Sequence, residues 1–288
     1  MKPPPFEYVR PVDLDGVLGA LAQNSGETKI LAGGQSLVPM MNLRLVAPKR
    51  LVDINRVPGL DRISRDGDRL LIGGLARHTD VLTSPVVREY APLVVAAYRH
   101  VAHRPIRNRG TIGGNLAHAD PASELPAVML ALDAEFVLRS LAGERQVAAE
   151  RFFLGTFETA ARADEVLTAI HIPLAAGSRR WGFEETSQRQ GDFALVAVAV
   201  TFAVDGGRCA NPRLRVCRCR RPRRAKRRCR SRAGGPEPGR DPFRTGGGQS
   251  GGSRRPAGGS PCRRRVSPRS RPRPDATSIA FSTSPASA

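Results

Sequence analysis

The chain has 288 residues, enough for one large domain or two to three smaller ones. Of its 46 Lys and Arg, 21 lie in residues 215–288 together with three acidic residues, so that part carries +18 and residues 1–214 carry +2. The strongly basic balance therefore belongs to residues 215–288, and we expect no nucleic-acid partner for the nearly neutral first part.

Residues 1–57 are expected to form a small domain in which helices and strands alternate. Apolar residues at helical spacing predict a helix over Val12–Gln23. Short apolar runs predict buried strands at Lys29–Ala32 and Leu51–Ile54, with a helix over Leu37–Leu45 between them.

Residues 58–175 continue the alternation. A strand and turn are expected at Leu70–Gly74, and two helices follow. The remaining predicted elements of this region are a helix, a hairpin and a strand ended by Pro173: Glu124–Leu132, Ala134–Arg139 with Glu144–Ala148, and Glu165–Ile172. The two earlier helices are expected at Thr79–Leu82, where Pro85 interrupts, and at Tyr90–Ala102.

Residues 176–214 are expected to begin a separate C-terminal domain, because two further strands are predicted at Trp181–Glu185 and Ala194–Val204. The fold class is therefore α+β. The longest apolar run, Phe193–Val204, is too short to span a bilayer, and Met1–Phe6 lacks the apolar core of a signal peptide. We expect a cytoplasmic protein without a membrane segment.

Two glycine pairs, Gly33–Gly34 and Gly113–Gly114, are candidate phosphate-binding turns. A diphosphate needs converging backbone N–H groups, and residues without a Cβ let the main chain approach it closely. Gly33–Gly34 follows a predicted strand and precedes a predicted helix, whose N-terminus favours negative charge. Taken alone, each pair is more typical of a plain turn, and neither has Rossmann or Walker spacing.

Two longer stretches resemble a known family. They are Ala32–Leu37, AGGQSL, and residues 107–126, RNRGTIGGNLAHADPASELP. Both are similar to the FAD-binding medium subunit of molybdenum hydroxylases, a family that includes carbon monoxide dehydrogenase and the flavin part of xanthine dehydrogenase. The resemblance extends from about Pro5 to about Asn211. It implies a two-subdomain FAD fold of the vanillyl-alcohol-oxidase-like type (1–57 and 58–175), followed by an incomplete C-terminal α+β domain (176–214).

The resemblance also implies which residues hold FAD. Asp120 and Glu124 would accept hydrogen bonds from ribose or ribityl hydroxyls, and Ala102 and Leu167 would line the ring system. The complete implied set is Lys29, Ile30, Leu31, Ala32, Gly33, Gly34, Gln35, Ser36, Leu37, Ala102, Thr111, Ile112, Gly113, Gly114, Asn115, Asp120, Glu124 and Leu167. No catalytic residue or metal ligand on this chain is implied, and no role is carried over to Glu184.

The implied partners are a small subunit with [2Fe-2S] clusters and a large subunit with the molybdenum cofactor, in a heterotrimer or its dimer. In such an assembly the flavin collects electrons from the iron–sulfur clusters and passes them to an external acceptor. Two alternatives stay open: a self-contained FAD-dependent oxidase or reductase, and a basic-tailed nucleic-acid-binding protein.

Metal binding by the chain itself is not expected. His100 and His103 lie three residues apart at the end of a predicted helix, where contact with the helix C-terminus explains them more simply than a metal does. Cys209 is the one cysteine of residues 1–214, and an iron–sulfur cluster needs about four thiolates. Any such cluster must therefore lie on another chain.

Residues 215–288 consist mostly of Arg, Pro, Gly and Ser. They are either a disordered basic arm that binds a polyanion or the product of a shifted reading frame, which in a GC-rich gene yields these residues. We favour the shifted frame, because a natural arm rarely interrupts a domain. The coding DNA around codon 214 distinguishes the two, since a shifted open frame of ordinary composition is expected only in the second case.

Overall fold

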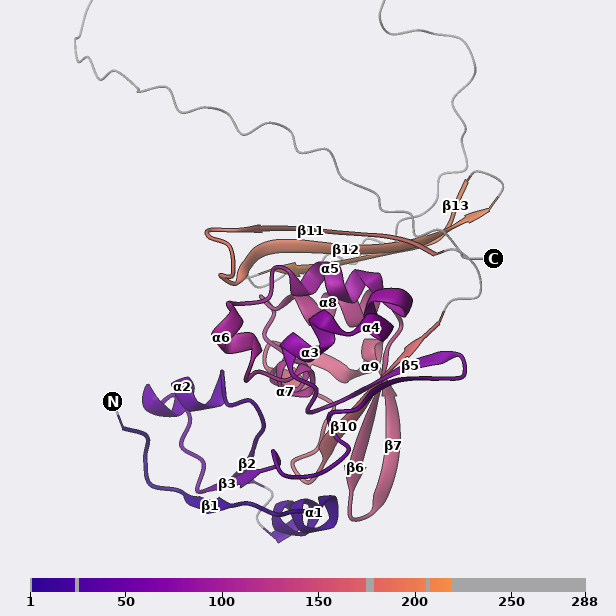
Figure 1. Cartoon of the computed structure of the whole chain (residues 1–288). Coiled ribbons are helices and arrows are strands. Elements are labelled where there is room, and N and C mark those ends of the chain that lie inside the picture. The colour runs from indigo at the N-terminus through magenta and orange to yellow at the C-terminus, as the bar shows by residue number, and fades with distance from the viewer. Residues whose placement is uncertain (1, 24–25, 175–178, 206–207, 219–288) are drawn as a thin grey trace, which may run out of the picture. The chain divides into compact units, whose positions relative to one another are not determined.

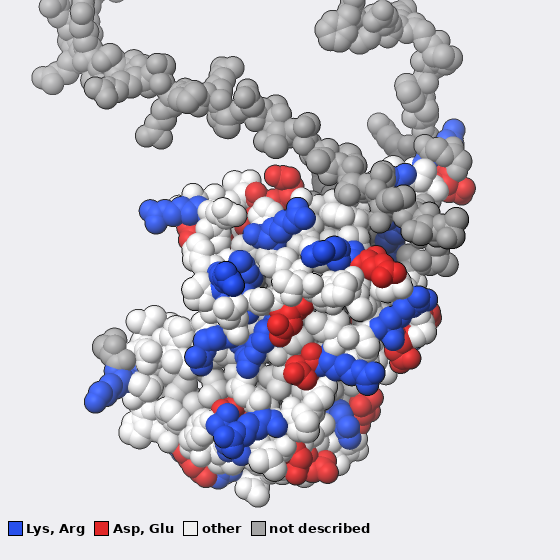
Figure 2. Space-filling view, viewed as in Figure 1, with Lys and Arg blue, Asp and Glu red and all other residues white. Residues whose placement is uncertain are grey.

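A computed structural model describes residues 2–23, 26–174, 179–205 and 208–218 (Figure 1). The predicted basic tail therefore lies, except for its first residues, outside the described residues. Lys and Arg side chains are interspersed with Asp and Glu over the face seen in Figure 2. Within the described part of the chain, no helix is long and apolar enough to cross a bilayer.

A three-stranded parallel sheet forms the N-terminal subdomain. Its strands β1 (Glu7–Val9), β2 (Thr28–Leu31) and β3 (Arg50–Asp53) are ordered β1-β3-β2. The chain can return to start each parallel strand because the helices α1 (Leu14–Gln23) and α2 (Leu37–Asn42) serve as connections. The apolar face of α1 packs on β3 in one core cluster, as the helical spacing predicted.

A five-stranded antiparallel sheet forms the central subdomain, with the order β4-β5-β10-β6-β7. Its strands are β4 (Ile63–Asp66), β5 (Arg69–Gly73), β6 (Glu135–Ser140), β7 (Gly143–Ala148) and β10 (Val166–Pro173). The predicted strands in this region and the predicted hairpin are confirmed, and β4 is an addition. The sheet packs its apolar face on helices, forming the main core cluster, in which Leu70, Phe136 and Ile170 are fully buried.

Seven short helices belong to this region of the described chain. They are α3 (His78–Thr83), α4 (Pro85–Tyr90), α5 (Pro92–Tyr98), α6 (Arg104–Arg107), α7 (Ile112–His118), α8 (Glu124–Ala131) and α9 (Ala149–Phe152). Pro85 begins α4, and the predicted helix Tyr90–Ala102 is shorter because Pro92 begins α5. Proline suits the first helical turn, where its missing N–H has no intrahelical partner.

A third, antiparallel sheet consists of β11 (Arg179–Ser187), β12 (Ala194–Asp205) and β13 (Arg208–Arg218). Figure 1 shows the helices α5 and α8 against this sheet, and Thr201 Oγ1 donates to the Ala131 carbonyl of α8 at 2.9 Å. β13 was not predicted, and it continues past the boundary predicted at residue 214. Its Cys217 is buried, and burial raises the pKa of that thiol to about 12.

A small hairpin of β8 (Phe153–Gly155) and β9 (Glu158–Thr159) completes the described strands. Its connecting residue Phe157 has a φ of 57°, and the Phe157 N–H donates to the Ala119 carbonyl at 3.1 Å. Through this bond the hairpin is held against the end of α7. The hairpin thus reaches the region where the two predicted glycine turns meet.

Candidate cofactor site

A cavity of about 830 Å³ is lined by residues of the parallel sheet, the five-stranded sheet and α7, and by the connection between β11 and β12. Most of the residues that the sequence predicted to hold a cofactor line it. They are Lys29, Ile30, Ala32, Gly33, Gly34, Gln35, Ser36, Leu37, Ala102, Thr111, Gly113, Gly114, Asn115, Asp120, Glu124 and Leu167. The predicted Leu31 and Ile112 do not line it, and Ile112 is fully buried in the main core. Residues far apart in the sequence therefore share one cavity.

The loop Gly33–Ser36, between β2 and α2, has unpaired donors. Among the described residues, no hydrogen-bond partner is found for the backbone N–H groups of Gly33 through Ser36. Gly34 has a φ of 71°, the left-handed region that favours glycine. Consecutive N–H groups in such a loop form a concavity that binds anions. The loop therefore has the donor arrangement that the sequence predicted for it.

Asn55 and Arg77 hold this loop in place, and sequence reasoning missed both. Asn55 Nδ2 donates to the Ala32 carbonyl at 2.8 Å, while Arg77 donates to Asn55 Oδ1 at 2.6 Å and to the Arg109 carbonyl. The bond to the Ala32 carbonyl fixes the backbone directly before the loop. It uses none of the N–H groups of Gly33–Ser36. The asparagine directly after the predicted strand Leu51–Ile54 was the local signal for this role.

The structure requires glycine at position 33 for a different reason from the predicted one. A Cβ at Gly33 would lie 2.5 Å from the Arg109 carbonyl oxygen and 2.7 Å from Gly110 Cα. The missing side chain therefore lets the first loop contact the backbone that leads into α7. This close approach joins the two predicted glycine motifs, and it does so through protein atoms.

The second glycine pair differs from the prediction in its local structure. Gly113 and Gly114 lie in the first turn of α7, capped by Thr111, rather than in a turn between a strand and a helix. Their N–H groups are already paired: Gly113 donates to the Gly74 carbonyl at 3.0 Å and Gly114 to Thr111 Oγ1 at 3.1 Å. Among the described residues, unpaired backbone N–H groups therefore lie at the first loop rather than at the second glycine pair, which forms part of the cavity wall.

Carboxylates line another part of the cavity. Glu124, the first residue of α8, has 4% of its surface exposed, and burial raises its pKa to about 7. The nearby charges of Glu185 and Asp120 raise it further. Asp120 Oδ1 accepts a bond from the Ala122 N–H at 2.8 Å. These groups suit hydroxyl donors and would repel a phosphate.

The cavity as a whole fits a flavin dinucleotide. It has backbone N–H groups without a partner among the described residues at Gly33–Ser36, carboxyl groups at Asp120 and Glu124, and apolar wall at Ala102 and Leu167. Phosphate, sugar and ring each have a matching chemical surface in one cavity. Within the described residues, no group of three or more His, Cys, Asp or Glu could hold a metal ion.

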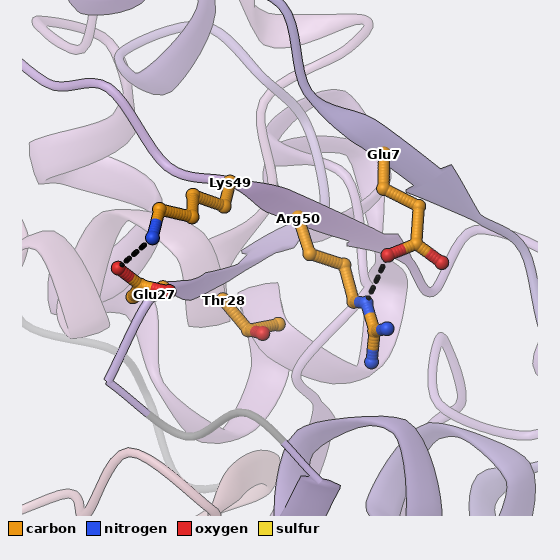
Figure 3. A pocket seen from close by; sticks show the side chains of 5 residues that line it. All are labelled: Glu7, Glu27, Thr28, Lys49 and Arg50. Atoms are coloured by element: carbon orange, nitrogen blue, oxygen red, sulfur yellow. Dashed lines mark hydrogen bonds and ion pairs between the residues drawn. The ribbon is translucent and has the colours of Figure 1, made fainter.

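A second, smaller hollow lies on the N-terminal sheet (Figure 3). Its charged side chains pair with each other: Lys49 Nζ is 2.6 Å from Glu27, and Arg50 Nε is 2.7 Å from Glu7. Figure 3 shows both pairs on neighbouring strand ends, with Thr28 between them. These charges neutralise one another at the surface, and the buried side-chain atom of the hollow that has no hydrogen-bond partner among the described residues is Thr28 Oγ1.

Comparison with known proteins agrees with this geometry. The family described as the FAD binding domain in molybdopterin dehydrogenase matches residues 4–175. This chain belongs to that family. It is an oxidoreductase subunit with an FAD-binding domain of the molybdenum hydroxylase type.

The match extends past residue 175 in individual relatives of this FAD-binding family. The alpha subunit of the 6-hydroxypseudooxynicotine dehydrogenase complex of Paenarthrobacter nicotinovorans is 42% identical over 217 residues, which are 75% of this chain and 73% of the relative. A chain of carbon monoxide dehydrogenase from Hydrogenophaga pseudoflava superposes with a TM-score of 0.74 at 39% identity, covering 75% of this chain and 76% of that one. Quinoline 2-oxidoreductase from Pseudomonas putida 86 gives 0.72 at 41% identity, with 75% of each chain covered. The mixed helix and strand fold is therefore that of the family.

The contact at Gly33 yields a first prediction. Gly33→Ala places a methyl group against the Arg109 carbonyl, so the free energy of unfolding should fall by about 2 kcal/mol and the two loops should separate. Gly19→Ala is the matched control, because a Cβ there meets no atom within 4 Å and alanine favours the helix. Chemical denaturation measures both, and equal effects of the two substitutions would contradict the close contact.

Glu124 yields a pH-dependent prediction. Its folded-state pKa of about 7 exceeds the ordinary value of 4.5, so stability present below pH 4.5 is lost as the pH rises to 7. Because glutamine does not ionise, the free energy of unfolding of Glu124→Gln should fall by about 3 kcal/mol less than that of the wild type over this pH range. Unfolding free energies of the two proteins from pH 4.5 to 8 measure it. Glu144→Gln, at an exposed position of β7, is the matched control, and a Glu124→Gln protein with the wild-type slope would refute the assignment.

Proposed function

We propose that this chain is the electron-transferring FAD subunit of a molybdenum hydroxylase. The observation that supports this most is the row of N–H groups at Gly33–Ser36 that have no partner among the described residues and open into the same cavity as the carboxyl group of Glu124. Membership of the FAD-binding family agrees with it. The bound flavin would accept electrons one at a time and release two.

The chain's own residues bind and orient the cofactor. Gly33–Ser36 would donate to the diphosphate, with Lys29 adding positive charge at the cavity. Asp120 and Glu124 would accept from the sugar or ribityl hydroxyls, and Ala102 and Leu167 would border the rings. No side chain of this subunit needs to act as an acid or base, since the substrate would react on another subunit.

The proposed partners are a small [2Fe-2S] subunit and a large molybdenum subunit, in a heterotrimer or its dimer. Names of relatives support a multi-subunit setting, since one is a subunit of a dehydrogenase complex and another is the nicotine 6-hydroxylase medium subunit. Electrons would enter from the iron–sulfur clusters and leave to an external acceptor. The substrate pocket would lie outside this chain.

The proposed domain arrangement follows from the sheets. Residues 1–57 and 58–175 would form the two subdomains of a vanillyl-alcohol-oxidase-like FAD fold, with the cavity between the parallel sheet and the antiparallel sheet. The strands β11–β13 would begin the C-terminal domain. We extend that part to Arg218, because β13 pairs with β12 as far as Arg218.

Isolation of the full chain from its native cells tests the proposal. A tagged copy, purified under mild conditions, should carry FAD together with molybdenum and iron in fixed ratio, measured by absorbance and elemental analysis. A protein that carries FAD without either metal, and whose flavin is reduced by small substrates alone, would instead be a self-contained oxidase or reductase. A chain that binds no flavin, or one that binds nucleic acid instead, would refute the proposal.

A further inference from the structure

A buried His–Tyr pair at the cavity is not among the FAD-binding residues that the family resemblance implies. His78 is the first residue of α3 and lines the cavity, whereas Tyr98 is the last residue of α5. His78 Nδ1 lies 3.1 Å from the Tyr98 hydroxyl oxygen. His78 is 5% exposed and Tyr98 is fully buried, so this hydrogen bond is shielded from water.

Burial decides the charge state of both groups. Burial and the nearby charge of Glu124 raise the pKa of Tyr98 well above its usual value, so the phenol keeps its proton. Burial, with the positive charges of Arg107 and Arg77, lowers the pKa of His78 to about 4. At neutral pH a neutral imidazole therefore faces a protonated phenol.

We propose that Tyr98 fixes the tautomer of His78, so that the imidazole presents Nε2–H as a neutral hydrogen-bond donor to an acceptor atom of bound FAD. This inference rests on the proposed function, because it takes FAD as the occupant of the cavity. It adds a binding residue, His78, and a positioning residue, Tyr98, to the site.

The available protons and acceptors determine the direction of the hydrogen bond between Tyr98 and His78. A phenol has one proton to donate, and among the described residues His78 Nδ1 is the one hydrogen-bond partner of the Tyr98 hydroxyl. If Tyr98 donates, Nδ1 is the acceptor and the ring proton must be on Nε2. The reverse arrangement would leave the buried phenol proton without an acceptor, which costs free energy.

The other ring nitrogen is the one available to a ligand. No hydrogen bond is found for His78 Nε2 within the described part of the chain, although the residue lines the cavity. The edge that carries Nε2 lies against Gly110: a Cβ at Gly110 would be 2.6 Å from His78 Cδ2 and 2.9 Å from Nε2. Gly110 also contacts Gly33, so this edge is next to the proposed diphosphate loop.

Backbone contacts hold the imidazole in this place. The His78 N–H donates to the Gly110 carbonyl at 3.0 Å, and Arg77 donates to the neighbouring Arg109 carbonyl. His78 is thus attached to the same backbone segment that Gly33 contacts. A neutral donor in this position can donate a hydrogen bond to a cofactor oxygen without the cost of burying another cation.

The tautomer itself is measured on the FAD-free protein. Nitrogen-15 NMR of the full chain with labelled histidine distinguishes a protonated ring nitrogen from an unprotonated one. We expect His78 to show Nε2–H in the wild type and a mixture of tautomers in Tyr98→Phe. Tyr90→Phe is the matched control, because the exposed Tyr90 hydroxyl accepts from Arg65 and not from a histidine.

The donor role is measured by equilibrium titration with FAD. His78→Leu should raise the Kd for FAD about tenfold, as expected for a lost hydrogen bond to a polar acceptor. His78→Gln keeps an N–H near the position of Nε2 and should recover part of the affinity, while Tyr90→Phe should bind as wild type. Titration with ADP locates the acceptor: an equal loss with ADP places it on the diphosphate, and a loss with FAD alone places it on the flavin half.

Either of two results would overturn the inference: a wild-type His78 protonated at Nδ1, or an unchanged Kd for FAD in His78→Leu. If Tyr98→Phe does not fold, the wild-type tautomer and the two His78 variants still decide the question. A wild-type chain that folds, shows the Nε2–H tautomer and binds no FAD would refute the proposed function, while the tautomer assignment would stand.

Discussion

The contact of Gly33 with the backbone of Arg109 and Gly110 is the constraint on which the site depends. The two segments are separated by more than seventy residues, and no side chain can be accommodated between them. Their contact brings the loop after β2 to the N-terminus of α7 and so creates one cavity from two subdomains. His78 is attached to the same segment through Gly110. Close packing of main chain on main chain, rather than a side-chain interaction, thus defines the cofactor site.

The cavity is electrically asymmetric, and the hydrogen bonds around it explain why. Asn55 occupies the Ala32 carbonyl, whereas the N–H groups of Gly33–Ser36 have no partner among the described residues. At α7 the opposite holds, because the N–H groups of its first turn are used within the protein. Glu124 adds a carboxyl group elsewhere in the cavity wall, and burial keeps this carboxyl partly protonated near neutral pH. One surface favours phosphate and another favours hydroxyls.

The connection between β11 and β12, Gly191–Phe193, lines part of the cavity, while strands of this third sheet leave apolar side chains exposed. The inner face of β12 packs on α8 through small residues and the Thr201 hydrogen bond. Buried Glu185 of β11 has no hydrogen-bond partner for its carboxylate oxygens among the described residues, and it raises the pKa of Glu124. Apolar side chains of these strands are exposed, among them Leu195, Val196, Leu214 and Val216. This sheet therefore provides a charge that acts on Glu124 in the cavity, and it also exposes apolar side chains of its own strands.

The sequence by itself determined the alternation of elements and the loop at Gly33–Gly34, because apolar spacing, proline and glycine act on the local backbone. The family motifs extended this to residues such as Ala102 and Leu167. Only the tertiary structure decided that Gly113 donates to Gly74, that Asn55 orients the first loop and that Tyr98 meets His78. Each of these depends on a partner twenty or more residues away, and local pattern carries no information about which distant atom will satisfy a buried polar group.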